Sequence, residues 1–111
     1  MCHLLFNHNV RVLNAKVEDG SSEGLCGAVL SVYMEMEYVF NIALRSKRYL
    51  PFLRDLRAAY KAVTQANALA FRIDMDEYQR RYIQDKAGYI RQRIASYIDT
   101  SDMDNATSKS A

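Results

Sequence analysis

The sequence predicts a mostly α-helical fold, a small helical bundle, and three observations support that prediction. Apolar residues recur at intervals of three and four in the second half of the chain, which is the period of an amphipathic helix. The middle of the chain is rich in alanine, the residue with the highest helix propensity. The lone proline precedes a leucine-rich segment, as expected at the start of a helix.

Residues 51–73 form the clearest predicted helix. Pro51 suits the first helical position, where its missing N–H leaves no hydrogen bond unmade. At about 100° per residue, the apolar residues of this segment gather on one side and most of its cations gather on the other. The apolar side contains Phe52, Leu56, Ala59, Tyr60, Val63, Ala66 and Ala70.

Residues 75–98 form a second predicted helix. Asp74 is the expected N-cap, with Glu77 three residues later in a variant of the capping box. A straight continuation from 51–73 would place the two apolar sides on nearly opposite faces. We therefore predict a turn near residue 74 and a long antiparallel helix pair. The aliphatic side of the second helix contains Ile83, Ala87, Ile90, Ile94 and Ile98.

The segment 25–48 precedes this pair, and its apolar residues fit both a helical period and a strand period. No turn residue interrupts it beyond Gly27, and this length favours a helix. Residues 10–17 fit either a strand or a short helix, and residues 18–24 are a loop on both interpretations. The alternative fold is therefore α+β with an N-terminal β-hairpin.

We predict a single compact domain over residues 1–98 and a disordered polar tail over residues 99–111. No apolar run approaches the ~18 residues of a membrane span, and the N-terminus lacks the features of a signal peptide. The expected location is the cytoplasm or the nucleus, where Cys2 and Cys26 are free thiols.

No recognisable set of catalytic residues is present, so we predict a protein that is not an enzyme and binds no cofactor or metal. Ser22 lies in a G-x-S-x-G pattern, but both histidines precede it and no large parallel sheet is predicted. The two cysteines and two histidines lack the paired spacing typical of zinc ligands.

Charge is distributed unevenly along the chain, although the formal net charge is only +2. Residues 1–40 contain two cations and five acids, whereas residues 41–98 contain twelve cations and five acids. Such asymmetry indicates the kind of partner that a protein binds rather than its fold. The candidate binding surface therefore lies in the second half of the chain.

The polar side of segment 51–73 is the main candidate site. Like charges on neighbouring helical positions repel, and Asp55, the acid of this segment, is expected on the other side. Phosphates would offset this repulsion, so we predict binding of nucleic acid. A solvated face whose acids come from another segment is the alternative. The predicted site comprises Arg45, Lys47, Arg48, Arg54, Arg57, Lys61, Thr64, Gln65 and Arg72.

Tyrosines of segment 75–98 form a second candidate surface. They lie on a line distinct from the isoleucines, so this helix has apolar material on two sides and needs two neighbours. The pattern predicts a homodimer, and aromatic and arginine residues are common anchors of protein interfaces. The alternative function is thus an adaptor or inhibitor that docks on an acidic partner protein. The predicted interface comprises Tyr78, Tyr82, Lys86, Tyr89 and Arg93.

Overall fold

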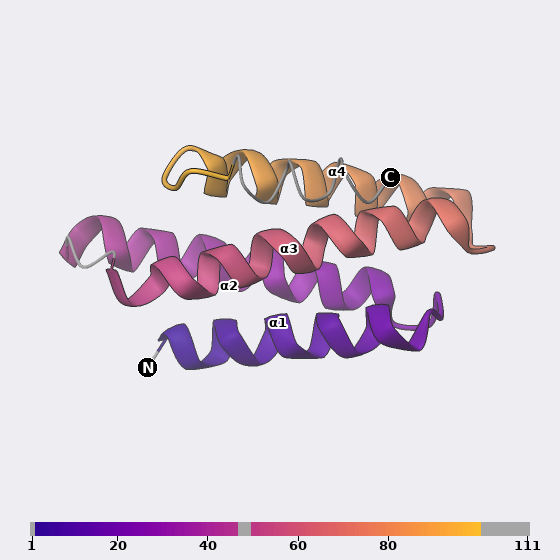
Figure 1. The fold of residues 1–111 in the computed structure, drawn as a ribbon, viewed down its shortest axis with the longest axis horizontal. Coiled ribbons are helices and arrows are strands. Elements are labelled where there is room, and N and C mark those ends of the chain that lie inside the picture. The colour runs from indigo at the N-terminus through magenta and orange to yellow at the C-terminus, as the bar shows by residue number, and fades with distance from the viewer. Residues whose placement is uncertain (1, 47–49, 101–111) are drawn as a thin grey trace.

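The computed structural model describes the backbone of residues 2–46 and 50–100 and the side chains of residues 5–41 and 54–100. Within these ranges the chain forms a bundle of four α-helices (Figure 1). The helices are α1 (Cys2–Asp19), α2 (Leu25–Ser46), α3 (Leu50–Arg72) and α4 (Glu77–Ala95).

The predicted mostly α-helical bundle is confirmed. The helices expected over 25–48, 51–73 and 75–98 begin and end within three residues of their predicted bounds. Successive helices run antiparallel, so α1 and α3 share one direction and α2 and α4 share the other (Figure 1).

Each helix has two principal neighbours in the bundle. α1 and α4 lie at opposite edges, with α2 and α3 between them (Figure 1). α1 and α4 each pack on both α2 and α3, whereas α2 and α3 share a smaller contact. The bundle therefore contains two parallel pairs, α1 beside α3 and α2 beside α4.

Residues 2–19 form a helix, so the alternative prediction of an N-terminal β-hairpin is wrong. Phe6, Val10 and Leu13 are buried at helical spacing and belong to the core. A strand would place Val10 and Val12 on the same face, yet Val12 is exposed while Val10 is buried. The local sequence of residues 10–17 fits both a helical and a strand period, and packing against α2 and α3 selects the helix.

The loop between α1 and α2 is shorter than predicted, because α1 continues to Asp19. Gly20 has φ +70° and Gly24 has φ +75°, in the left-handed region that glycine adopts without a steric penalty. The Gly20 N–H donates to the Val17 carbonyl (3.1 Å) and satisfies one carbonyl in the last turn of α1.

One hydrophobic core fills the bundle, and the predicted apolar sides face it wherever their side chains are described. Phe52 lies outside the described side chains, and Ile98 is partly buried against the core. The buried members of the predicted sides of α3 and α4 are Leu56, Ala59, Tyr60, Val63, Ala66, Ala70, Ile83, Ala87, Ile90 and Ile94.

The turn between α3 and α4 differs from the prediction in its capping residue. Asp76, not Asp74, is the N-cap of α4, and its carboxylate accepts a hydrogen bond from the Gln79 N–H (3.1 Å). Asp74 is exposed two residues earlier. α4 begins at Glu77 because the aspartate that reaches a free N–H of the first turn sets the helix start.

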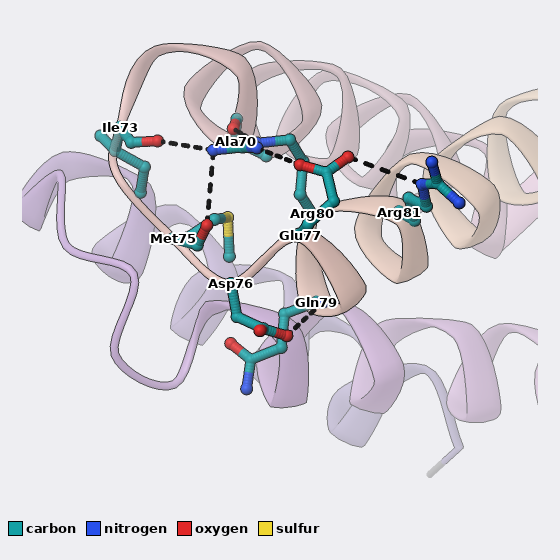
Figure 2. A network of polar contacts seen from close by, with 8 residues as sticks. All are labelled: Ala70, Ile73, Met75, Asp76, Glu77, Gln79, Arg80 and Arg81. Atoms are coloured by element: carbon teal, nitrogen blue, oxygen red, sulfur yellow. Dashed lines mark hydrogen bonds and ion pairs between the residues drawn. The ribbon is translucent and has the colours of Figure 1, made fainter.

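Arg80 joins the end of α3 to the start of α4 (Figure 2). Its Nε donates to the Ala70 carbonyl (2.8 Å), and its Nη2 donates to the carbonyls of Ile73 (3.2 Å) and Met75 (3.5 Å). Its Nη1 forms an ion pair with Glu77. A cation at this place satisfies one carbonyl in the last turn of α3 and two in the turn that follows, and it interacts favourably with the C-terminal end of the α3 dipole. The guanidinium group of Arg80 is therefore engaged by groups of its own chain.

The chain returns to α3 after α4 ends. Thr100 is buried, and Nη1 of Arg57 donates to the Asp99 carbonyl (3.4 Å). Residues 101–111 of the predicted tail lie outside the described residues. None of the helices over the described ranges combines the length and the apolar character that crossing a bilayer requires.

Candidate functional site

Three cations of α3 lie outward along one line of the helix surface. Lys61 follows Arg54 by seven residues, and Arg72 follows Lys61 by eleven. At about 100° per residue, each step returns to within about 20° of the same direction. All three side chains are exposed. With a rise of about 1.5 Å per residue, the line extends over about 27 Å.

The acid of α3 lies away from this line, as predicted. Asp55 is only 7% exposed, and its Oδ1 accepts a hydrogen bond from Nδ2 of Asn7 on α1 (2.9 Å). Among the described residues, no carboxylate forms an ion pair with Arg54, Lys61 or Arg72. The charge of these three cations is therefore not neutralised by an ion pair within that part of the chain.

Two other residues of the predicted site interact within the fold. Arg57 donates to the Asp99 carbonyl, so the segment after α4 engages its guanidinium group. The Thr64 hydroxyl donates to the Tyr60 carbonyl one turn earlier (2.8 Å), a common bond of helical threonines. The remaining predicted residues Arg45, Lys47 and Arg48 lie outside the described side chains.

α1 adds a cation that the sequence analysis missed. Arg11 is exposed and lies beside Arg54 along the contact between α1 and α3. A helical interpretation of 10–17 would have placed Arg11 on an outer face, but only the tertiary contact shows that this face adjoins α3. We define the basic face as Arg11, Arg54, Lys61, Gln65 and Arg72, all of them exposed.

An open groove of about 220 Å³ lies between α1 and α3 at one end of the basic face, and we call it the α1/α3 groove. It combines two guanidinium groups, two carboxamides and one carboxyl group. Donors for an anion and acceptors for a polar hydrogen therefore lie close together. The groove is lined by Asn7, Val10, Arg11, Asn14, Arg54, Asp55 and Ala58.

The interface between α2 and α4 contains an ion pair. Oε1 of Glu37 accepts a hydrogen bond from the Tyr89 hydroxyl (3.0 Å) and lies 3.5 Å from Nε of Arg93. This hydrogen bond, with desolvation as a smaller cause, raises the pKa of Tyr89 above its ordinary value. The rings of Tyr33 and Tyr89 meet edge to face, with 5.4 Å between their centroids. These contacts join α4 to α2.

Cations of α4 also lie over aromatic rings at this interface. Nζ of Lys86 lies 4.5 Å from the ring centroid of Tyr33 and 5.6 Å from that of Tyr82. The guanidinium carbon of Arg93 lies 5.0 Å from the ring centroid of Phe40. All three distances fall within the range of about 6 Å over which cation–π attraction operates.

The tyrosines of the predicted interface lie in different environments. Tyr89 contacts α2 of the same chain, so α2 is the second neighbour that the pattern of α4 requires. Tyr78 is 80% exposed and lies beyond these contacts. The sequence did not indicate the pairing of Tyr89 with Glu37, because the two residues are 52 positions apart.

Other candidate chemical groups lie apart from one another. Among the residues with described side chains, no three His, Cys, Asp or Glu residues gather into a metal-binding group. His8 is exposed on α1, and Ser22 is half-buried in the loop after it. Cys26 is half-buried on α2, where burial raises the pKa of its thiol. Cys2 and His3 lie outside the described side chains.

Comparisons of this chain with family models, with curated proteins and with solved structures find no match. The candidate site is therefore defined by the geometry and charge of the chain itself. Its two components are the basic face and the α1/α3 groove.

Proposed function

We propose that this chain is a small, non-enzymatic helical protein that binds single-stranded nucleic acid through the basic face. The observation that carries the proposal is the row of exposed cations with no ion-pair partner among the described residues. Each of these cations that neutralises a phosphate releases counterions bound to the nucleic acid, and this release favours binding.

The dimensions of the basic face suit a strand of several nucleotides. The ~27 Å between Arg54 and Arg72 corresponds to at most about eight nucleotides, at the ~3.4 Å per nucleotide of a strand stacked as in duplex DNA. Gln65 lies between Lys61 and Arg72 and offers both a donor and an acceptor. Arg11 widens the face toward α1 beside Arg54.

The position of α3 in the bundle favours a single strand over a duplex. A recognition helix enters a major groove about 12 Å wide, so it must stand clear of its neighbours. α3 is instead flanked by α1 and α4 along its length (Figure 1). Its outer surface therefore suits a single strand that lies along α3 with its bases accessible.

A matched pair of charge reversals tests the proposal. Lys61→Glu reverses an exposed cation of the basic face, and Arg81→Glu reverses a cation on α4 whose side chain is 79% exposed. Both variants change the net charge equally. We expect Lys61→Glu to weaken binding of a mixed-sequence single strand about tenfold or more at low salt, and Arg81→Glu to change it less than about threefold. Fluorescence anisotropy measures the affinities, and circular dichroism checks that both variants are folded.

Equal losses in the two variants would contradict the proposal, because they would show attraction by net charge without a defined surface. Absence of binding by the wild-type protein at low salt would reject nucleic acid as the ligand. Unaltered folding of Lys61→Glu is expected, since exposed substitutions of this kind usually change stability by less than about 0.5 kcal/mol.

Docking on an acidic partner protein is the second candidate function, and two exposed aromatic residues favour it. Phe71 is 65% exposed and Tyr78 is 80% exposed, near the turn that follows Arg72. Aromatic and arginine side chains are frequent anchors of protein interfaces. Polyglutamate is a suitable probe: binding that Tyr78→Ala weakens supports docking, and binding that this variant leaves unchanged contradicts it.

Self-association is the remaining proposal about partners. The exposed Tyr78 can contact a second copy, although Tyr89 already packs on α2 of its own chain. Light scattering distinguishes the outcomes, because a monomer has a mass of 12.8 kDa and a homodimer has twice that mass. A monomer at high protein concentration would contradict the dimer.

A further inference from the structure

The α1/α3 groove contains a buried carboxyl group with free acceptor capacity. Asp55 is 7% exposed and lines the groove. A carboxylate has about four acceptor positions, and within the described part of the chain Asn7 occupies one of them. The other acceptor positions of the carboxylate remain for further partners. Asp55 is therefore available to accept a hydrogen bond from a ligand.

Arg11 and Arg54 determine the charge that a ligand in this groove must carry. Both line the groove with exposed side chains, and two guanidinium groups outnumber the one carboxyl group. A small cation is therefore disfavoured. The guanidinium groups suit an anion such as a phosphate, whereas Asp55 suits a neutral hydrogen-bond donor. A ligand with an anion and a donor close together satisfies both.

A nucleotide of the proposed single strand has this combination. Its phosphate matches the arginines, and cytosine carries an amino group that donates hydrogen bonds, where uracil carries a carbonyl group that accepts them. The groove volume of about 220 Å³ lies below the ~300–1000 Å³ of pockets that hold whole small molecules. This volume suits one ring.

We propose that the α1/α3 groove is a base-binding subsite, and this proposal rests on the proposed binding of single-stranded nucleic acid. In it, Asp55 accepts a hydrogen bond from the exocyclic amino group of one base, so that cytosine is preferred to uracil. Asn7 positions the carboxyl group through its 2.9 Å bond. Asn14, half-buried along the same groove, offers a donor for the carbonyl group of the cytosine ring.

Two single strands that differ in one functional group test the subsite. Strands of deoxycytidine and of deoxyuridine, each about 12 nucleotides long, span the basic face with some length to spare. We expect the wild-type protein to bind the cytidine strand about tenfold more tightly, the ratio typical of one hydrogen bond to a carboxylate. Fluorescence anisotropy at a single low salt concentration measures both affinities.

Two variants assign the preference to the groove. Asp55→Asn keeps the size of the side chain and the oxygen that accepts from Asn7, so an amide nitrogen, which only donates, replaces the second carboxylate oxygen. We expect the ratio of affinities to fall below about twofold. Ala58→Leu fills the groove from an exposed position without changing Asp55, and it lowers the ratio in the same way if Asp55→Asn fails to fold.

The outcomes separate the subsite from the basic face. If the wild-type protein binds both strands equally while Lys61→Glu still weakens both, the subsite is overturned and the basic face stands. A preference for cytidine that persists in folded Asp55→Asn and in Ala58→Leu also overturns the subsite. If the wild-type protein binds neither strand, the proposed function fails and the subsite fails with it.

Discussion

The two interfaces between parallel helices place their charged groups in opposite situations. Between α2 and α4, Glu37 contacts both Tyr89 and Arg93, so acid and base neutralise each other inside the interface. Between α1 and α3, the carboxyl group of Asp55 is turned inward to Asn7. The cations beside it face outward without an ion-pair partner among the described residues.

This difference shows that the number of cations in a helix does not predict its surface charge. α4 contains five cations and α3 contains four. Every cation of α4 contacts a carbonyl group, an aromatic ring or a carboxylate of the same chain. Among the residues with described side chains, Arg54, Lys61 and Arg72 of α3 have no such contact. Cations of the first kind are expected to support stability, and those of the basic face are expected to support binding. The contacting cations of α4 are Arg80, Arg81, Lys86, Arg91 and Arg93.

Removal of the aromatic support of the α2/α4 interface should give the largest effect. Phe40 is buried, stacks on Tyr97 with 4.7 Å between ring centroids, and lies under Arg93. Phe40→Ala leaves a cavity, so we expect the free energy of unfolding to fall by about 3–5 kcal/mol. Urea denaturation measures this change. A loss below about 1 kcal/mol would contradict the close packing of Phe40 in the α2/α4 interface.

Loss of the cation at the α3–α4 turn should have the next largest effect. Arg80→Ala removes the donors for three carbonyl groups (Figure 2), and we expect it to lower the free energy of unfolding by about 2 kcal/mol. Arg81→Ala is the matched control, since its exposed ion pair with Glu77 should contribute less than about 1 kcal/mol. Equal losses in the two variants would refute the structural role of Arg80.

Titration of Tyr89 gives a smaller and more local readout of the same interface. The bond to Glu37 raises the pKa of Tyr89 in the folded protein above the ordinary value of about 10. A raised pKa means that this stabilisation is present below about pH 10 and is lost as pH rises through the folded pKa. We expect Glu37→Gln to lower the pKa of Tyr89, as measured from its ring carbon signals by NMR.

Glu35→Gln is the control for that titration. Glu35 lies on the same helix, but Tyr89 bonds to Glu37. The control should leave the pKa of Tyr89 unchanged. If the two variants lower that pKa equally, the long-range field of α2 controls Tyr89 and the hydrogen bond does not.

The sequence predicted α3 and α4 well because their local signals agree. Pro51 marks the start of one helix, and the isoleucine period of the other continues through its buried side. α1 was left open because residues 10–17 fit two periods, and burial of Val10 but not Val12 resolves them. The helices α3 and α4 could be predicted from the local sequence pattern. The choice between helix and strand for residues 10–17 depended on packing against the neighbouring helices.

The candidate site was predictable in part for the same reason. The line through Arg54, Lys61 and Arg72 follows from helical geometry alone. Asn7 and Asp55 line the α1/α3 groove and bond to each other although they are 48 positions apart, and no local spacing indicates this pairing. The engagement of Arg57 by the segment after α4 likewise depends on tertiary structure.

Salt dependence of binding tests the central claim most directly. Four cations of the basic face that each neutralise one phosphate of a single strand predict a slope of about −2.8 for log affinity against log salt concentration. The measurement uses the wild-type protein and a mixed-sequence strand over a series of salt concentrations. A slope close to this value is the expected result. A slope near zero, with binding otherwise intact, would contradict the claim that the basic face binds phosphates.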